Sequence, residues 1–230
     1  MNLLLLSNST NAGQQYMEWC KNIINNFVDE DKKNIIFIPY AAASFTYSEY
    51  TNTVNSALSE VGLEVKNIDS FSDKSEVIKN ASAIFIGGGN TFHLLKMLQD
   101  LNLIDAIRQR VEDGAPYVGW SAGSNVSCPQ ISTTNDMPIV QPNSFDALKL
   151  IPYQINPHYT DKTIPNHGGE SRGQRLKEYL YVNRNDKVIC LPEASYIVYE
   201  RSIATYYGKE NGLLLSYNES TNLGIGDIIK

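Results

Sequence analysis

One serine in this chain stands in a pattern typical of a catalytic nucleophile. Ser121 is the centre of Gly119-Trp120-Ser121-Ala122-Gly123, a G-x-S-x-G motif that follows the apolar pair Tyr117-Val118. In such a nucleophile elbow a strand ends, the chain turns sharply through the serine, and a helix begins, so that the hydroxyl is exposed above the sheet edge. The N–H of Ala122, at the start of that helix, can stabilise a developing oxyanion. The motif therefore predicts acyl transfer through Ser121.

A serine nucleophile needs a general base whose pKa lies near the working pH, and histidine is the usual choice. The chain holds three histidines. His93 lies inside a predicted helix, and His167 lies in a glycine-rich loop. His158 follows Pro157 in an irregular segment, and we expect it to be the base. A purely structural histidine is the alternative.

An imidazole base also needs a carboxylate that fixes its tautomer and stabilises the imidazolium. Two residues qualify. Glu193, in Leu191-Pro192-Glu193-Ala194, comes just after a predicted buried strand, at the sheet edge. Asp136 lies in Thr133-Thr134-Asn135-Asp136-Met137-Pro138, where it could instead orient a loop or bind a substrate amine. The sequence leaves both residues open as the third member of a triad.

Glycines follow another predicted strand at Gly87-Gly88-Gly89-Asn90-Thr91. A dinucleotide fingerprint requires glycine where Phe92 stands, and no P-loop Lys-Ser/Thr follows. We therefore expect Gly88 and Gly89 to bring backbone N–H groups close to Ser121. A tight turn capped by Asn90 or Thr91, or a site that binds an anion without catalysis, is the alternative.

Two arginines lie one helical turn apart, at the start of a predicted helix. An arginine fork binds a carboxylate through two hydrogen bonds, so Arg172 or Arg175 could select an acidic group of the substrate. The alternative for each is a solvated helix face. The sequence has no H-E-x-x-H, C-x-x-C or clustered His/Asp pattern, so we expect no metal.

The elements that must position these residues alternate along the chain. Apolar runs predict strands at residues 3–6, 34–39, 63–68, 83–86, 117–118 and 188–191, and helical stripes lie at 16–27, 47–61, 94–98, 103–111 and 171–182. This alternation predicts an α/β fold with a mostly parallel sheet flanked by helices. Prolines make residues 128–170 irregular, and short runs after Tyr196 predict antiparallel strands that end the sheet. We expect one domain over residues 1–230.

Composition and charge indicate which binding partners and which cellular compartment to expect. The 230 residues carry a formal net charge of −6 and no basic run, which argues against nucleic acid. The leucines at 3–6 are too few for a signal peptide or a membrane span. Cys20, Cys128 and Cys190 are far apart and odd in number, so we expect buried, reduced thiols in a cytoplasmic protein.

Long blocks of the sequence resemble the peptidase E family, the bacterial α-aspartyl dipeptidases, which are serine peptidases related to cyanophycinase. The matching blocks cover almost the whole chain: Leu4-Leu5-Leu6-Ser7-Asn8-Ser9-Thr10, Gly87-Gly88-Gly89-Asn90-Thr91-Phe92, Gly119-Trp120-Ser121-Ala122-Gly123, Thr133-Thr134-Asn135-Asp136-Met137-Pro138-Ile139-Val140, Gln154-Ile155-Asn156-Pro157-His158, Gly169-Glu170-Ser171-Arg172 and Leu191-Pro192-Glu193. The chain departs from the family at Ser124, Ser171 and Ala194, where the family has alanine, threonine and glycine.

The resemblance implies a fold like that of class I glutamine amidotransferases (flavodoxin-like) and hydrolysis of dipeptides with an N-terminal aspartate. It implies Ser121 as nucleophile and His158 as base, with Glu193 or Asp136 as third member. By the same carry-over, Gly89 and Ala122 supply the oxyanion N–H groups beside Gly88, and Arg172 holds the substrate aspartate. No cofactor is implied.

Other functions stay open at this point. A cyanophycinase-like peptidase would cleave β-linked aspartyl substrates, and a non-catalytic module would use the glycine turn to hold an anion. An amidotransferase-like glutaminase is disfavoured because its nucleophile is cysteine, whereas position 121 is serine. We expect a small peptide substrate, no membrane partner, and a monomer or homodimer.

Overall fold

The computed structural model describes residues 1–28, 33–163 and 168–229, which form two β-sheets with helices around them. The larger sheet has eight strands in the order β12-β9-β8-β1-β5-β4-β2-β3. Its parallel part consists of β1 (Asn2–Leu6), β5 (Tyr117–Trp120), β4 (Ala83–Ile86), β2 (Ile35–Ile38) and β3 (Val65–Asn67). The predicted α/β class with a mostly parallel sheet is confirmed.

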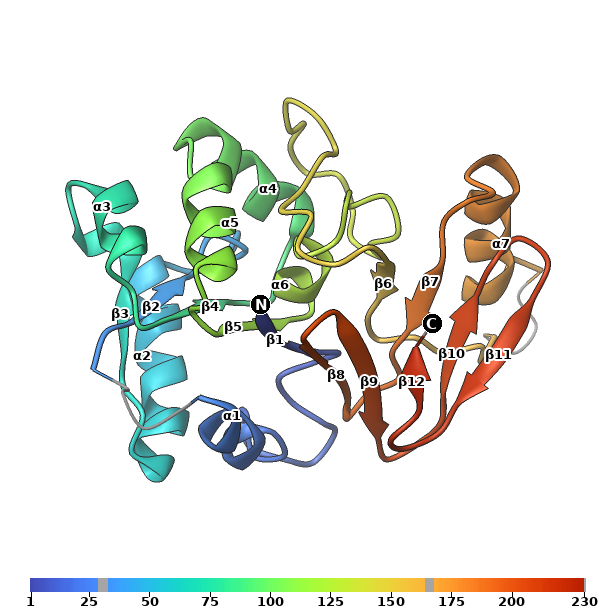
Figure 1. Ribbon diagram of the computed structural model, residues 1–230, viewed down its shortest axis with the longest axis horizontal. Helices are drawn as coiled ribbons and strands as arrows, with labels where there is room; N and C mark the ends of the chain where they lie inside the picture. Colours follow the sequence, from blue (N-terminus) through green and yellow to red (C-terminus); the bar gives the residue numbers. More distant parts are fainter. Residues whose placement is uncertain (29–32, 164–167, 230) are drawn as a thin grey trace.

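Helices cover both faces of this sheet because its parallel strands are joined by helical crossovers. Figure 1 shows α1 (Lys21–Phe27) and α2 (Tyr47–Leu58) below the sheet, and α4 (Thr91–Asp100) and α5 (Ile104–Glu112) above it. Side chains of β1 alternate accordingly. Leu3 and Leu5 pack with α4 and α5, whereas Leu4 and Leu6 pack with α1 and α2. A strand buried on both faces explains the continuous leucine run.

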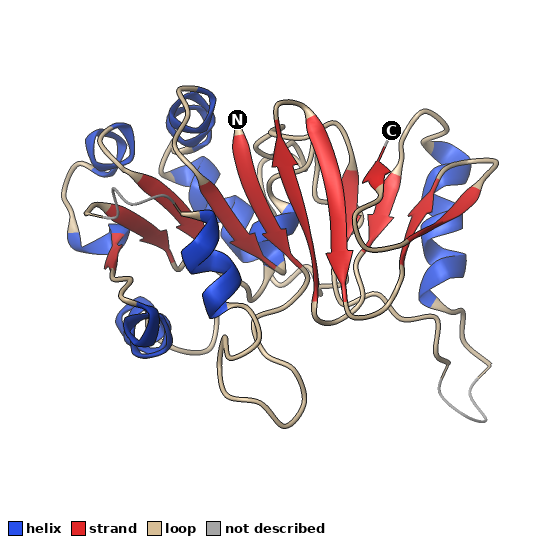
Figure 2. Ribbon diagram, turned by 60° about the horizontal axis from the view of Figure 1, so that its bottom comes forward, coloured by secondary structure: helices blue, strands red, loops and turns tan. Residues whose placement is uncertain are grey.

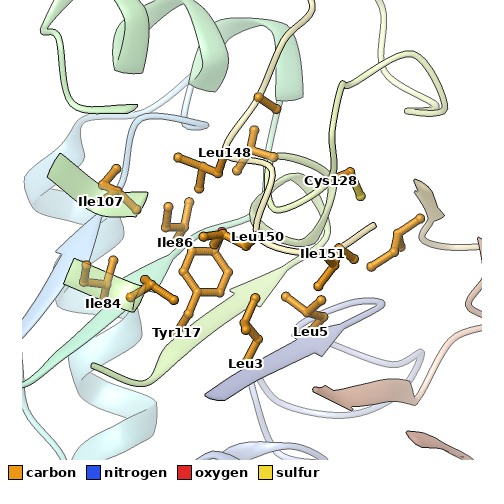
Figure 3. Close-up of a cluster of buried hydrophobic side chains, with 14 of the residues drawn as sticks. Leu3, Leu5, Ile84, Ile86, Ile107, Tyr117, Cys128, Leu148, Leu150 and Ile151 are labelled. Atoms are coloured by element: carbon orange, nitrogen blue, oxygen red, sulfur yellow. The ribbon is translucent and has the colours of Figure 1, made fainter. Parts of the chain in front are cut away.

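The proline-rich segment also contributes to the core. Figure 3 shows Leu148, Leu150 and Ile151 beside Tyr117 and the leucines of β1, in the cluster that covers the upper face of the sheet. Between residues 126 and 153 the chain is mostly irregular, as expected. Its apolar side chains nevertheless cover β1 and β5, as helices cover other strands of the sheet. It then enters β6 (Gln154–Asn156), a strand that the prolines had hidden from the sequence analysis.

The C-terminal part corrects one expectation. The antiparallel strands β8 (Ser195–Glu200), β9 (Ile203–Gly208) and β12 (Ile228–Ile229) do extend the large sheet. However, β7 (Val188–Cys190) pairs with β6 and with β10 (Gly212–Leu215), and β10 pairs with β11 (Ser220–Leu223), in a second sheet of order β11-β10-β7-β6. The expectation of one sheet was therefore wrong, because pairing of such short strands depends on contacts between distant segments.

The second sheet has its own helix. Leu176 and Leu180 of α7 (Arg172–Val182) pack on Val188, Cys190 and Leu215. Figure 2 shows this helix at the right-hand end of the molecule, against the smaller sheet. The main hydrophobic core nevertheless extends from the large sheet to the small one. Ile155 and Ile189 of the small sheet belong to the same cluster as Leu3 and Leu5 of β1. The expectation of one domain stays a prediction.

Two helices differ from their predicted form. The helix expected over 16–27 is shortened to α1, because residues 12–20 form turns and Met17 adopts a φ of 58°. A short helix, α3 (Lys74–Lys79), was not predicted, and its N-cap is Asp73, whose side chain accepts a hydrogen bond from the N–H of Glu76. None of the helices among the described residues is long and apolar enough to cross a membrane.

The expected buried, free thiols are confirmed, and each lies in a different hydrophobic cluster. Cys128 belongs to the cluster above the sheet, Cys20 to the cluster below it, and Cys190 to the cluster under α7. Burial raises the pKa of Cys20 and of Cys128 to about 12, and it raises the pKa of Cys190 as well. The three thiols therefore stay protonated at neutral pH.

Candidate active site

Ser121 occupies a sharp, strained turn between β5 and α6 (Ala122–Asn125). Its φ of 52° and ψ of −109° are unusual for a residue with a side chain and match a nucleophile elbow. The glycines permit this turn. A Cβ on Gly123 would lie 2.1 Å from the carbonyl oxygen of Ile86, and one on Gly119 would lie 2.6 Å from the Gly123 backbone. The G-x-S-x-G spacing therefore reflects close backbone approach on both sides of the serine.

His158 lies between Ser121 and Glu193. Its Nε2 is 2.8 Å from the Oγ of Ser121, and its Nδ1 is 2.7 Å from Oε1 of Glu193. With Nδ1–H donating to the carboxylate, Nε2 is free to accept the serine proton. The geometry thus permits proton transfer from Ser121 to an imidazole whose tautomer is fixed by Glu193.

The second sheet positions the histidine and the glutamate. β6 and β7 are parallel neighbours with Asn156 opposite Cys190, so His158 and Glu193 follow at the same sheet edge. Ser121 and the glycine turn follow β5 and β4 of the large sheet, which are adjacent. The ends of parallel strands are where open α/β sheets place their sites. Here the strand ends of two sheets meet.

Ser7, at the end of β1, links the two sheets, and the sequence analysis missed this role. The buried Ser7 hydroxyl accepts a hydrogen bond from the N–H of His158 at 2.8 Å and donates one to the carbonyl of Leu191 at 2.8 Å. Next to it, Oδ1 of Asn8 accepts from the N–H of Ala194 at 2.9 Å. The signal in the sequence was a pair of polar residues directly after a buried strand.

Ala194, where the family resemblance implies glycine, has a backbone conformation that favours glycine. Its φ is 57°, in the left-handed region, which costs an alanine roughly 1–2 kcal/mol. His158 has a φ of 54° as well. The hydrogen bonds that the N–H groups of His158 and Ala194 donate to Ser7 and Asn8 hold both of these turns in place.

The glycine turn lies against Ser121. A Cβ on Gly88 would be 3.1 Å from Cβ of Ser121 and 3.2 Å from the carbonyl oxygen of Trp120, so only glycine fits closely there. Gly89 has a φ of 137°, and a Cβ on it would lie 2.3 Å from the carbonyl oxygen of Ala41. Across the site, Ala122 is the first residue of α6, a position whose N–H has no partner within the helix.

Asp136 is not in contact with His158. Its Oδ2 accepts hydrogen bonds from the N–H of Thr91 at 2.7 Å, at the start of α4, and from the Thr134 hydroxyl at 3.1 Å. Asp136 lines a pocket of about 390 Å³ together with Arg172, Arg175 and Asn156. Oδ1 of Asn156 has no hydrogen-bond partner among the described residues, but it is buried. The pocket therefore offers a carboxylate and a guanidinium to a ligand.

The two arginines differ in their surroundings. Arg172 begins α7, whose N-cap Ser171 forms a capping box with Gln174. Burial and the charge of Arg175 lower the pKa of Arg172, and the carboxylate of Asp136 opposes this shift. The side chain of Arg175 is 72% exposed, with its Nε 3.9 Å from Glu170. Arg172 is therefore the more buried cation of the pocket, and it stays charged at neutral pH.

A second pocket, of about 290 Å³, contains the serine itself. Ser121, His158, Gly88 and Gly89 line it together with the side chain of Phe45. Of the other histidines, His93 is engaged elsewhere through Nδ1, 2.6 Å from the carbonyl of Tyr40, and His167 lies outside the described residues. No group of three or more His, Cys, Asp or Glu among the described residues is arranged to hold a metal ion.

Comparison with known proteins gives concordant results. A family model described as "Peptidase family S51" matches residues 3–206. The chain is 47% identical to peptidase E of Nostoc sp. over 94% of this chain and 90% of that protein. It is 45% identical to peptidase E of Haemophilus influenzae, over 93% and 99% of the two chains. The crystal structure of a peptidase from an acI-B1 actinobacterium superposes with a TM-score of 0.74 at 19% identity, covering 99% and 96%, which shows a shared fold.

Proposed function

Because the chain belongs to peptidase family S51 and is a serine-type peptidase, we propose that it hydrolyses dipeptides with an N-terminal aspartate through Ser121. The observation that carries this proposal is the hydrogen-bonded series from Ser121 through His158 to Glu193. The name peptidase E of two relatives, at 47% and 45% identity, supports this substrate class.

In the proposed reaction the Oγ of Ser121 attacks the carbonyl carbon of the aspartyl residue, and Nε2 of His158 accepts the serine proton. The N–H groups of Gly89 and Ala122 stabilise the oxyanion. His158 then protonates the leaving amine, the C–N bond breaks, and an aspartyl ester of Ser121 remains. Water, deprotonated by His158, hydrolyses the ester and regenerates the serine.

We assign the third triad position to Glu193, since its carboxylate accepts the hydrogen bond from His158 Nδ1. Asp136 then binds the substrate, because its carboxylate lines the same pocket as Arg172 and suits the free α-amine of a dipeptide. We assign the substrate's side-chain carboxylate to Arg172 rather than Arg175, because the greater burial of Arg172 strengthens a charged pair. Three free cysteines favour a reducing compartment, so we place the protein in the cytoplasm.

The test is hydrolysis of Asp-Leu against Asn-Leu, Glu-Leu, acetyl-Asp-Leu and β-linked Asp-Leu, with the wild-type protein and Ser121→Ala. We expect cleavage of Asp-Leu alone, and none by the variant. Cleavage of the β-linked peptide instead would assign the protein to cyanophycinase-like substrates. Absence of cleavage, together with absence of labelling of Ser121 by a fluorophosphonate, would favour the anion-binding alternative.

Arginine variants test the pocket. Arg172→Lys keeps the charge but loses the planar fork, so we expect KM for Asp-Leu to rise at least tenfold. Arg175→Lys, one turn along the same helix, is the matched control and should change KM by less than twofold. The reverse result would move substrate recognition to Arg175.

A further inference from the structure

A buried tyrosine connects the nucleophile strand to the glycine turn. The Oη of Tyr50, on α2, is 3.0 Å from Nε1 of Trp120 and 3.0 Å from the carbonyl oxygen of Gly88. Trp120 directly precedes Ser121, and both aromatic side chains lie inside the protein, at 0% and 5% exposure for Trp120 and Tyr50. One hydroxyl therefore bridges the two backbone segments that flank the serine.

The direction of these hydrogen bonds is fixed by chemistry. An indole N–H only donates and a carbonyl only accepts, so Tyr50 accepts from Trp120 and donates its single proton to Gly88. Burial raises the pKa of Tyr50, which keeps this proton in place at neutral pH. Gly87 allows the close approach, because a Cβ on Gly87 would lie 2.6 Å from the Tyr50 hydroxyl.

The carbonyl of Gly88 and the N–H of Gly89 belong to one planar peptide unit. When the C=O direction is fixed, the N–H points the opposite way. Glycines on both sides would otherwise leave this unit free to rotate, because glycine accepts positive and negative φ equally well. The hydrogen bond from Tyr50 removes that freedom at the one N–H group that the proposed mechanism takes from this turn.

We infer that Tyr50 is a positioning residue, which holds the Gly88–Gly89 peptide with its N–H toward the oxyanion and couples it through Trp120 to the nucleophile elbow. The inference rests on the proposed function, since it assumes an oxyanion at Ser121. Tyr50 also lines the pocket that contains Ser121, but in this role it acts through the Gly88–Gly89 peptide and not on the reacting atoms.

The first test is Tyr50→Phe, which keeps the ring contacts with Phe37 and Phe45 and removes the hydroxyl. Removal of one oxyanion donor costs about 10²- to 10³-fold, and a misoriented donor costs less. We therefore expect kcat for Asp-Leu to fall about 10- to 100-fold, with KM within twofold. Tyr47→Phe, one turn earlier on α2, is the matched control and should leave kcat within twofold.

Thermal melting separates positioning from stability. Tyr50→Phe leaves the indole N–H of Trp120 buried without its partner, which lowers the melting temperature. Kinetics measured well below the melting transition of the variant compare two folded proteins, and we expect the fall in kcat to persist there. A wild-type kcat in Tyr50→Phe under these conditions would overturn the inference.

Labelling of Ser121 by a fluorophosphonate distinguishes this inference from the proposed function, because the tetrahedral adduct needs the oxyanion donors whatever the substrate is. We expect Tyr50→Phe to slow labelling at least tenfold and Tyr47→Phe to leave it unchanged. If Asp-Leu is not cleaved but labelling follows this pattern, the substrate assignment fails and the role of Tyr50 stands. Equal labelling rates in an enzyme that cleaves Asp-Leu would overturn the role of Tyr50 alone.

Discussion

The two sheets contribute to the candidate site in different ways. On the large sheet, the elbow and the glycine turn follow adjacent parallel strands, and close backbone contacts at Gly88, Gly89 and Gly123 hold them. On the small sheet, His158 and Glu193 are 35 residues apart and follow strands of three residues each. Their turns depend on backbone N–H groups that donate to Ser7 and Asn8. Backbone sterics fix the first half, and side-chain hydrogen bonds fix the second.

The two halves of the site also differ in how far their side chains are exposed to solvent. The residues around the elbow, Trp120 and Ala122, are fully buried, whereas the side chains of His158 and Glu193 are 41% and 54% exposed. Substitutions on the small-sheet half should therefore change activity with little loss of stability. Substitutions of the elbow glycines should destabilise the fold itself, because the added Cβ atoms meet backbone.

The largest expected effect is that of His158→Ala. Loss of the proposed base should lower kcat for Asp-Leu on the order of 10⁴-fold or more. Because the imidazole is partly exposed, the melting temperature should stay within about 2 °C of wild type, as a ~0.5 kcal/mol surface change implies. Steady-state kinetics and thermal melting check both. Near-normal turnover by the variant would remove His158 from the mechanism.

A paired substitution compares the two carboxylates. Glu193→Gln leaves an amide beside Nδ1 of His158, which favours the wrong tautomer, and kcat should fall about 10²- to 10⁴-fold. Asp136→Asn keeps an acceptor for the N–H of Thr91 but removes the charge, so we expect a rise in KM that exceeds the fall in kcat. If kcat falls more in Asp136→Asn than in Glu193→Gln, the two roles are exchanged.

An intermediate effect is expected from Ser7→Ala. The variant leaves the N–H of His158 without its partner, whereas the carbonyl of Leu191 keeps the hydrogen bond from the N–H of Tyr159 at 2.9 Å. The orphaned N–H costs about 1–3 kcal/mol of unfolding free energy. The turn that carries the proposed base also loosens, so kcat should fall about tenfold. Urea unfolding and kinetics measure the two losses. Ser124→Ala, whose buried hydroxyl also bonds to backbone carbonyls, is the control that should lower stability with a smaller fall in kcat.

The smallest effect concerns the left-handed turn after Glu193. Ala194→Gly removes the strain of a positive φ, and part of this gain is offset by the greater backbone entropy of glycine in the unfolded chain. We expect unfolding free energy to rise by about 0.5–1 kcal/mol with kcat within twofold. A destabilised variant would contradict the strain argument at this position.

Local motifs of the site could be predicted from the sequence, whereas contacts between distant segments could not. The elbow and the glycine turn are local, so their residue patterns predicted a sharp turn at Ser121 and a glycine turn close to it. His158 was a candidate because the chain has only three histidines, and Glu193 was a candidate because it follows a predicted strand. The pairing of β6 with β7 was hidden, because three-residue strands carry no periodicity and the prolines around β6 argue against any strand. Ser7 was missed because its partners are remote, with Leu191 184 positions further along the chain.

The three buried cysteines allow local opening of the fold to be measured in the wild-type protein. Since each thiol lies in a separate hydrophobic cluster and stays protonated in the closed state, an alkylating reagent can reach it only when that cluster opens. Mass spectrometry of Cys20, Cys128 and Cys190 after timed labelling would therefore give the opening free energy of three regions in one native sample. Equal rates at the three thiols would mean that the two sheets open together as one cooperative unit.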